Sequence, residues 1–303
     1  MTDAVIGNVN ADLLVWPASE LPPPGAEHGV ERVDVRVGGA AGVAGAALGR
    51  LGADPLVVGC VGDDALGAAV VGELRGYGVD TGHVRSIPGL PTGVSIAFEA
   101  PGRDRSFLIS LGSLAAFEPS MVPEAALRAS HVLFCGYFNL PSMRGEATAN
   151  LLGRVKELGG TTMLDTGWDH DGWPGSTREE IGRLLTSVDV FLPNEAEAEG
   201  LTGESDPMAA AQALGRLSCG WVVVKLGEAG CVATGPGGET HRAGAPSVRV
   251  VDTTGAGDAL NAGLMRALGT GAAWPAALGS AVRVASAVVS RSSQDRYPSA
   301  DEL

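Results

Sequence analysis

The sequence predicts an α/β fold built around a mostly parallel central sheet, and three observations support this prediction. Short β-branched runs alternate with helical segments rich in Ala and Leu, which is the order of strands joined by covering helices. The chain has 303 residues, enough for one large core with a small appendage. Two segments break the alternation with period-two patterning that is typical of β-hairpins. We therefore expect one domain, residues 1–303, that carries a small second sheet.

The strands of the central sheet are predicted at short apolar or β-branched runs, at residues 4–6, 56–58, 132–134, 162–164, 188–191 and 221–224. The helices are predicted where apolar residues recur at three- and four-residue spacing, at about residues 40–51, 64–76, 144–158, 178–185, 195–200, 207–217, 257–268 and 273–288. A valine-rich stretch, Val248–Val251, reads as a further strand that leads into the helix at 257–268.

Two excursions from the alternation would form the small sheet. The first spans about residues 13–38, with Leu13–Trp16 and Val33–Val37 on either side of a proline-rich turn. The second spans about residues 92–110, with Thr92–Phe98 and Ser106–Ile109 on either side of Pro101–Gly102. Four such strands could form a lid that closes over a site and excludes water. The alternative is two separate surface hairpins.

Composition restricts the partners of the protein. A hydrophobic share of 45% with 18% charged residues is typical of a soluble globular protein, and the net charge of −14 argues against nucleic acid or an anionic membrane as partner. Lys156 and Lys225 are the only lysines, and no Gly-Lys-Ser/Thr sequence occurs, so a Walker-type phosphate loop is excluded. Any phosphate must then be bound by helix ends, backbone N–H groups and a cation.

The cysteines and the N-terminus predict a cytoplasmic protein. The four cysteines fall in apolar stretches without Cys-x-x-Cys spacing, which favours buried thiols in a reducing cytosol over disulfides or a zinc site. The first residues lack the basic and long apolar regions of a signal peptide, and no run of about 18 apolar residues predicts a membrane span.

The most informative segment is Asp252-Thr253-Thr254-Gly255-Ala256-Gly257-Asp258. Its two glycines lie where an extended run turns into a helix, so the backbone can approach a ligand and the first N–H groups of the helix point outward. Such a helix start is suited to phosphate. An acid at Asp258 beside that phosphate would remove a proton from an attacking hydroxyl. The alternative is that Asp258 favours the helix dipole and the glycines make a turn.

Polar and small residues near the N-terminus form a second candidate group. Asn10 and Asp12 follow the first predicted strand, at the end where α/β proteins bind ligands, and their side chains suit a polyol. The alternative for both is loop capping. Gly38 and Gly39 follow the predicted strand at 33–37 and permit a hinge and a close ligand approach, or tight helix packing.

Two further segments follow strands in the second half of the chain. Asn194 and Glu197 are three residues apart at a predicted helix start, so they could orient Mg²⁺ and its water shell, or form a capping box. Lys225 ends the strand at 221–224, and Gly227 and Gly230 in the turn after it would let a nucleotide lie against the backbone.

In this order, these segments resemble the ribokinase-like PfkB family of carbohydrate kinases over nearly the whole chain, and Asp252–Asp258 matches the C-terminal signature of that family without substitution. The resemblance implies a three-layer α/β/α domain with a mostly parallel sheet and a small β-sheet lid. It implies an ATP-dependent kinase in which Asp258 is the catalytic base and Gly255, Ala256 and Gly257 form the anion hole.

The resemblance also assigns the remaining candidates. It implies that the acceptor is contacted from the segments around Asn10, Asp12, Gly38, Gly39 and position 43, where Val43 stands. It implies that Asn194 and Glu197 organise Mg²⁺ and phosphate, with Glu197 acting through water, and that Lys225, Gly227 and Gly230 line the nucleotide. In some relatives the positions of Asp252 and Thr254 hold a monovalent cation, which makes K⁺ a candidate cofactor here.

Two departures from the family pattern bear on the acceptor. Val43 stands where sugar kinases of this kind usually carry an asparagine, and Tyr137, Phe138 and Asn139 stand where ribokinases carry an acid. The sequence therefore predicts transfer to a primary hydroxyl of a small sugar other than ribose. The alternatives are a nucleoside kinase of the same family and a non-catalytic sugar or nucleotide sensor. A dinucleotide-dependent oxidoreductase is disfavoured because G-x-G-x-x-G is missing after the first strand. An exposed lid could also pair with its twin in a homodimer.

Overall fold

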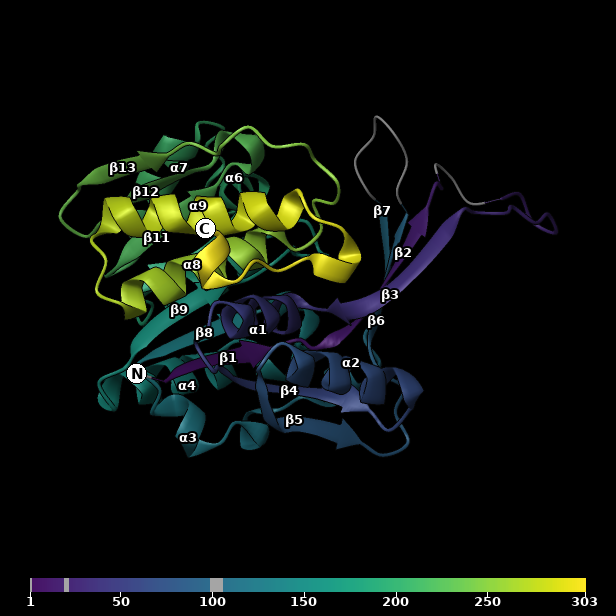
Figure 1. Ribbon diagram of the computed structural model, residues 1–303. Coiled ribbons are helices and arrows are strands. Elements are labelled where there is room, and N and C mark those ends of the chain that lie inside the picture. The colour runs from purple at the N-terminus through teal and green to yellow at the C-terminus, as the bar shows by residue number, and fades with distance from the viewer. Residues whose placement is uncertain (1, 19–21, 99–105) are drawn as a thin grey trace.

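The computed structural model describes residues 2–18, 22–98 and 106–303, and in them the chain forms two β-sheets of unequal size (Figure 1). The large sheet has nine strands, in the order β13 (Thr240–Ala243), β12 (Cys231–Thr234), β11 (Trp221–Lys225), β10 (Val190–Phe191), β9 (Thr161–Asp165), β8 (His131–Cys135), β1 (Asp3–Gly7), β4 (Leu56–Gly62) and β5 (Asp80–Ile87). The pairs from β5 to β11 are parallel, and β12 and β13 are antiparallel. The predicted mostly parallel sheet is confirmed.

Helices cover both faces of this sheet and give three layers. One face packs against α1 (Ala40–Arg50), α2 (Ala65–Gly76), α8 (Ala256–Gly269) and α9 (Trp274–Val289). The other packs against α3 (Glu124–Leu127), α4 (Glu146–Glu157), α5 (Gly175–Leu185), α6 (Glu195–Thr202) and α7 (Pro207–Gly215). Short 3₁₀ turns lie at Gly112–Ala116, Pro119–Met121, Tyr137–Asn139, Pro141–Met143, Gly227–Ala229, Ser293–Asp295 and Ala300–Glu302.

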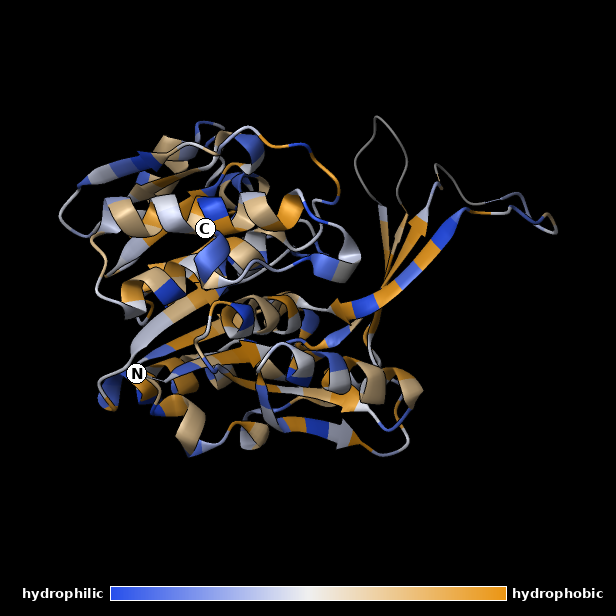
Figure 2. Ribbon diagram, in the orientation of Figure 1, coloured by the Kyte–Doolittle hydropathy of each residue, from blue (hydrophilic) through white to orange (hydrophobic). Residues whose placement is uncertain are grey.

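The parallel strands are apolar on both faces because both faces are covered. In β8, Leu133 belongs to the core under α1 and α8, whereas Val132 and Phe134 belong to the core under α4 and α5. This is the pattern of a buried parallel sheet, whose strands are nearly continuous hydrophobic runs. Figure 2 shows these central strands mainly in the hydrophobic colour.

The small sheet has four strands in the order β3 (Arg32–Gly38), β2 (Asn10–Trp16), β6 (Val94–Phe98) and β7 (Ser106–Ser110). The β2–β3 and β6–β7 pairs are antiparallel hairpins, and β2 and β6 join them in parallel. The two predicted excursions thus form one sheet, which projects from the main body (Figure 1). Hydrophobic and hydrophilic residues alternate along β3 (Figure 2). The predicted turn at Pro101–Gly102 lies outside the described residues.

Several sequence-based boundaries were wrong. The strands β5, β12 and β13 were not predicted, because β5 and β13 are partly exposed edge strands with mixed residues and β12 is only four residues long. The central strand at 188–191 is reduced to Val190–Phe191. Val248–Val251 is not a strand: it is exposed and belongs to neither sheet, so its β-branched residues do not reflect sheet burial.

Three of the four cysteines are buried. All four cysteines are free thiols, but Cys219 is exposed on the loop before β11, so the expectation of four buried thiols was wrong for that residue. Among the helices in the described ranges, none is long and apolar enough to cross a membrane.

Candidate active site

The candidate site lies at the carboxyl ends of the central parallel strands. The last residues of three neighbouring strands pair in register, Gly7 with Cys135 and Cys135 with Asp165. Farther along the same edge, Asn194 forms a bridge with Lys225 at the end of β11. The loops that follow these strands therefore meet at one edge of the sheet, which is where ligands bind in open α/β folds.

Two cavities open at this edge and meet at one turn. The first has a volume of ≈ 370 Å³, and the second a volume of ≈ 790 Å³. Thr253 and Ala256 line both cavities. The first cavity is otherwise lined by polar groups that include Asp258, and by residues of the small sheet. The second is lined mainly by apolar residues of α8, α9 and the 245–250 segment.

The turn between the cavities has the geometry that its glycines predict. Gly255 has φ 71° and is the N-cap of α8, which begins at Ala256. Because L side chains rarely adopt this conformation, Gly255 lets the chain turn sharply into the helix. The N–H of Thr254 donates to Oδ1 of Asp252 at 2.8 Å, which fixes the start of the turn. The N–H of Ala256 donates to the carbonyl of Thr253 at 3.2 Å.

Asp258 lies in the first turn of α8 and lines the first cavity, as its position in the motif predicts. The pKa of Asp258 is raised from 3.8 to about 7, chiefly by the loss of water around the carboxyl and also by the charge of Asp165, while Lys225 opposes the rise. A pKa near the working pH is what a general base requires.

Asp165 is a site residue that sequence reasoning missed. It ends β9, is buried, and lines the first cavity. Its Oδ2 accepts from Nζ of Lys225 at 2.6 Å and from Nδ2 of Asn261 at 2.5 Å. The available signal was its place at the end of a predicted parallel strand.

Lys225 lines the first cavity and not the second. Its buried ammonium pairs with Asp165, and a Cβ placed on Gly257 would be 3.4 Å from Nζ. Gly227 and Gly230, which were predicted together with Lys225 to line a nucleotide, line the second cavity, so the three residues do not share one cavity. Lys225, at the end of β11, lies next to Gly257 of α8, whereas the turn after β11 places Gly227 and Gly230 at the second cavity.

Asn194 and Glu197 form the capping box at the start of α6. The N–H of Glu197 donates to Oδ1 of Asn194 at 2.8 Å, and the N–H of Asn194 donates to Oε2 of Glu197 at 2.9 Å. The capping alternative is therefore present, and the same two residues also line the first cavity. The pKa of Glu197 is raised from 4.5 to about 7, chiefly by burial and also by the charge of Asp165, while Lys225 opposes the rise.

The N-terminal candidates Asn10 and Asp12 also line the first cavity. Asn10 and Asp12 belong to β2 and are not loop residues, and Nδ2 of Asn10 donates to Oδ1 of Asp12 at 3.0 Å. Burial raises the pKa of Asp12 from 3.8 to about 6, against the effect of Arg36. Asn8, which the sequence did not single out, lines the cavity too and accepts from the N–H of Ala40 at 3.0 Å.

The paired glycines make room for these polar side chains. A Cβ on Gly38 would lie 2.0 Å from Oδ1 of Asp12. Gly39 has φ 78°, and a Cβ there would lie 2.4 Å from the carbonyl of Asn8. Gly39 lines the first cavity, but Gly38 is not among the residues that line it. Gly38 therefore acts indirectly, because its missing side chain leaves room for the carboxylate of Asp12.

Of the two departures from the family pattern, the one at Val43 adds an apolar side chain to the lining of the first cavity. Val43 lines the cavity and is packed against Gly255. Of the trio Tyr137, Phe138 and Asn139, only Asn139 lines the cavity, because the Tyr137 hydroxyl bonds to Glu180 on α5 and Phe138 packs against Trp173. The apolar lining of the first cavity comprises Val43, Val94, Phe107, Ile109, Leu114 and Trp168.

Asp252 and Thr254, the predicted ligands of a monovalent cation, contact guanidinium groups. Oδ2 of Asp252 accepts from Nη1 of Arg36 at 2.5 Å and also from Nη1 of Arg296. The carbonyl of Thr254 accepts from Nη2 of Arg296. Sequence reasoning missed both arginines, which come from β3 and from the segment after α9.

An α/β/α domain with a small second sheet, a helix N-terminus between two cavities and a carboxylate that lines one of them belongs to the ribokinase-like class of folds. The chain is a member of the pfkB family of carbohydrate kinases, because residues 4–300 match the sequence model of that family. It is therefore an enzyme of the phosphotransferase class that acts on an alcohol group.

Individual relatives agree with this membership. The chain is 30% identical over 246 residues to the aminoimidazole riboside kinase of Salmonella typhimurium, with 80% of this chain and 76% of that protein covered. It is 26% identical to the ribokinase of Haemophilus influenzae, with 88% and 85% covered. A structure of Arabidopsis thaliana ribokinase with ribose and ATP superposes with a TM-score of 0.85 at 27% identity and covers 99% of this chain and 96% of that one.

Proposed function

We propose that the protein transfers the γ-phosphoryl group of ATP to a primary hydroxyl of a small sugar. The observation that carries this proposal is the turn at the start of α8, which borders both cavities, together with Asp258, which lines the first of them. In this arrangement the nucleoside occupies the apolar second cavity and the acceptor occupies the first. The migrating phosphoryl then lies at the turn.

The chain's own groups account for the chemistry in this proposal. Phosphoryl transfer passes through a loose transition state, so the protein mainly positions groups and neutralises charge. Asp258 takes the proton of the acceptor hydroxyl. The N–H groups of Gly255 and Gly257, with the helix dipole, stabilise the charge on the migrating group, and Ala256 shapes the wall between the cavities. The ammonium of Lys225 lies next to Gly257 and adds positive charge.

The acidic residues fit a magnesium ion bound through water. No group of three or more His, Cys, Asp or Glu side chains in the described ranges is close enough to hold a metal directly. Mg²⁺ usually keeps several waters and is bound through one or two carboxylates plus phosphates. Glu197 and Asp165 would hold such an ion, which would neutralise phosphate charge. The raised pKa of Glu197 fits a site that needs added positive charge.

The acceptor end combines polyol-binding groups with an apolar wall. Asn10 and Asp12 can bond to two hydroxyls, with Gly39 allowing a close approach. Val43 cannot make the polar contact that an asparagine would make at this position, which supports an acceptor other than ribose. A nucleoside acceptor is the second candidate, because Phe107 and Trp168 line this cavity and aromatic side chains can stack on a flat ring.

The test is ADP release measured over a panel of sugars, sugar phosphates and nucleosides, with the position of the new phosphate determined by NMR. The proposal requires acceptor-dependent ADP release and a phosphate on a primary hydroxyl. Arg178→Ala, on the outer helix α5, is a control that should keep full activity. Tight binding of sugar or nucleotide without turnover on any acceptor would favour the non-catalytic sensor.

We further propose that the small sheet acts as a lid and pairs with its twin in a homodimer. Val33, Val35 and Leu108 are about half exposed. By register Val35, Leu13, Ile96 and Leu108 form a row across the sheet, on the face opposite Asp12. A second copy would bury this apolar row. Light scattering at micromolar concentration tests it, and a monomeric mass would contradict it.

A further inference from the structure

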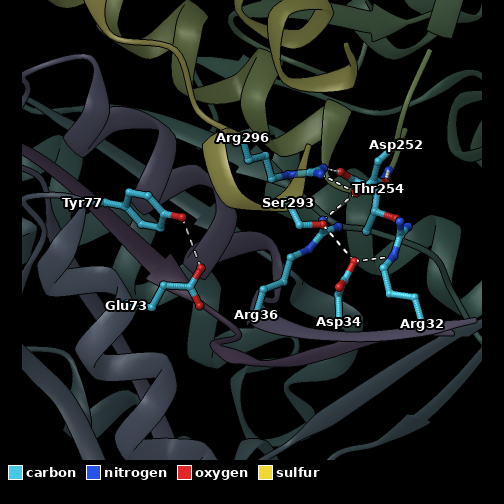
Figure 3. A network of polar contacts seen from close by, with 9 residues as sticks. All are labelled: Arg32, Asp34, Arg36, Glu73, Tyr77, Asp252, Thr254, Ser293 and Arg296. Atoms are coloured by element: carbon cyan, nitrogen blue, oxygen red, sulfur yellow. Dashed lines mark hydrogen bonds and ion pairs between the residues drawn. The ribbon is translucent and has the colours of Figure 1, made fainter. Parts of the chain in front are cut away.

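A side chain of the protein itself bridges the two groups that the family resemblance assigns to a monovalent cation. One nitrogen of the Arg296 guanidinium donates to the carboxylate of Asp252, and another donates to the carbonyl of Thr254 (Figure 3). Arg296 is only 2% exposed. A carboxylate and a backbone carbonyl are typical oxygen ligands of a hard cation, and here both bond to one planar cation that is covalently part of the chain.

The segment that carries Arg296 is anchored to the core. Its neighbour Tyr297 is buried and packs edge-to-face on Tyr77 at the end of α2, with ring centroids 5.1 Å apart. The carbonyl of Tyr297 accepts from Nε of Arg50 on α1 at 3.3 Å. The backbone that carries Arg296 is therefore held in place, so little conformational entropy is lost when the guanidinium makes its contacts.

Two cations of the chain itself already lie at this site. Two buried carboxylates, Asp12 and Asp252, interact with two buried guanidinium groups, Arg36 and Arg296. Within this cluster the two guanidinium groups offset the two carboxylates. A further monovalent cation at Asp252 would be a third positive charge in a place with little water, which is strongly unfavourable.

Arg296 is also close enough to the phosphate-binding turn to fix its shape. A Cβ placed on Gly255 would lie 3.7 Å from Nη2 of Arg296. Asp252, which accepts from Arg296, also accepts from the N–H of Thr254, the residue before Gly255. The guanidinium thus restrains both ends of the short loop that places Gly255 in its left-handed conformation.

We propose that the Arg296 guanidinium takes the place of a monovalent cation, so that this kinase needs no K⁺ and Arg296 is a positioning residue for the anion hole. The expected effect of Arg296 on turnover rests on the proposed function. The expected effects of Arg296 and K⁺ on the melting temperature do not. Arg36 contributes to the same cluster from the lid strand β3 and connects the lid to the phosphate-binding turn.

The first experiment measures the wild-type enzyme with and without K⁺. Tris salts of ATP are used, and tetramethylammonium chloride keeps the ionic strength constant while K⁺ rises from zero to 100 mM. We expect kcat and the melting temperature to stay the same within twofold and one degree, respectively. Activation by K⁺ of fivefold or more, or a melting temperature that rises specifically with K⁺, would overturn the proposal.

The second experiment removes the built-in cation. In Arg296→Ala we expect kcat to fall on the order of 10- to 100-fold, the value of hydrogen bonds to a charged group, with a smaller change in the KM of the acceptor. Millimolar K⁺ or guanidinium should restore part of kcat and raise the melting temperature. An Arg296→Ala enzyme with wild-type kcat in the absence of added cations would contradict the inference.

Two further variants separate charge from fold. Arg291→Ala, which removes a surface pair with Glu302 in the same C-terminal region, should behave like the wild type and show no response to K⁺. Arg296→Lys keeps the charge and should show a lower kcat without a K⁺ response; a response as strong as that of Arg296→Ala would refute the role of the charge. If no acceptor gives turnover, the melting temperatures of the same variants still decide the question.

Discussion

Replacing Asp258 by Asn keeps the size of the side chain and removes its charge, and we expect opposite effects on catalysis and on stability. Catalysis should fall because the acceptor hydroxyl loses its base. General bases contribute about 10²- to 10⁴-fold, which corresponds to about 3 to 5 kcal/mol in the activation free energy. Nucleotide binding should remain, because the amides of the turn and the second cavity are unchanged.

The effect on the free energy of unfolding has the opposite sign. The pKa of Asp258 is raised from 3.8 to about 7 in the fold. A carboxyl with a raised pKa favours the folded state when protonated, so this stability is present below pH 4 and is lost as the pH rises to about 7. Each pH unit is worth about 1.4 kcal/mol, which gives an upper bound of about 4 kcal/mol above pH 7. Asp258→Asn should therefore be more stable than the wild type at pH 8, and equally stable near pH 4.

Urea unfolding of both proteins at pH 4 and pH 8, together with ADP release, measures these effects. If Asp258 served only the helix dipole, its replacement would lower stability at pH 8 by about 0.3 to 1 kcal/mol and would leave turnover intact. Glu195→Gln is the control, because Glu195 is an exposed acid in the first turn of α6. A near-normal kcat in Asp258→Asn, or a loss of stability at pH 8, would refute the reasoning.

Four other outcomes are expected. The kcat/KM for the acceptor should rise about tenfold per pH unit up to about pH 7 and then level off, which a pH–rate profile checks. Lys225→Met should cost about 3 to 5 kcal/mol in urea unfolding, because Asp165 is left buried without its cation, and Asp165→Asn in the same chain should recover most of that loss. Gly39→Ala should raise the KM of the acceptor about tenfold or more, because the new Cβ meets the carbonyl of Asn8; an unchanged KM would contradict the close approach. Chelation by EDTA should stop turnover, and Glu197→Gln should raise the Mg²⁺ concentration needed for half-maximal rate about tenfold.

The sequence predicted those parts of the site that depend on neighbouring residues. Gly255 and Asp258 lie in one seven-residue segment, and a helix start after a glycine turn follows from local backbone chemistry alone. The pair Asn194 and Glu197 was likewise predicted from three-residue spacing, with the capping box as the stated alternative. The hairpins of the small sheet were visible in their period-two patterning, although β2 begins at Asn10, earlier than expected.

Groups that meet across long sequence separations were not predicted. Asp165 meets Lys225 across 60 residues, and Arg36 meets Asp252 across 216 residues. None of these residues stands in a pattern that marks its partner. Lys225 shows the same limit, because its side chain points under α8 while the glycines that follow it line the other cavity.

The sequence by itself determined the layered fold, the glycine turn before α8 and the acid that follows it, since each arises from periodicity or from backbone conformation over a few residues. Only the tertiary structure decided which charges share the buried space around that turn. Burial makes an unpaired charge costly, so the fold had to bring Arg36 and Arg296 to Asp252, and Lys225 to Asp165. Such pairing depends on where distant segments of the chain come to lie.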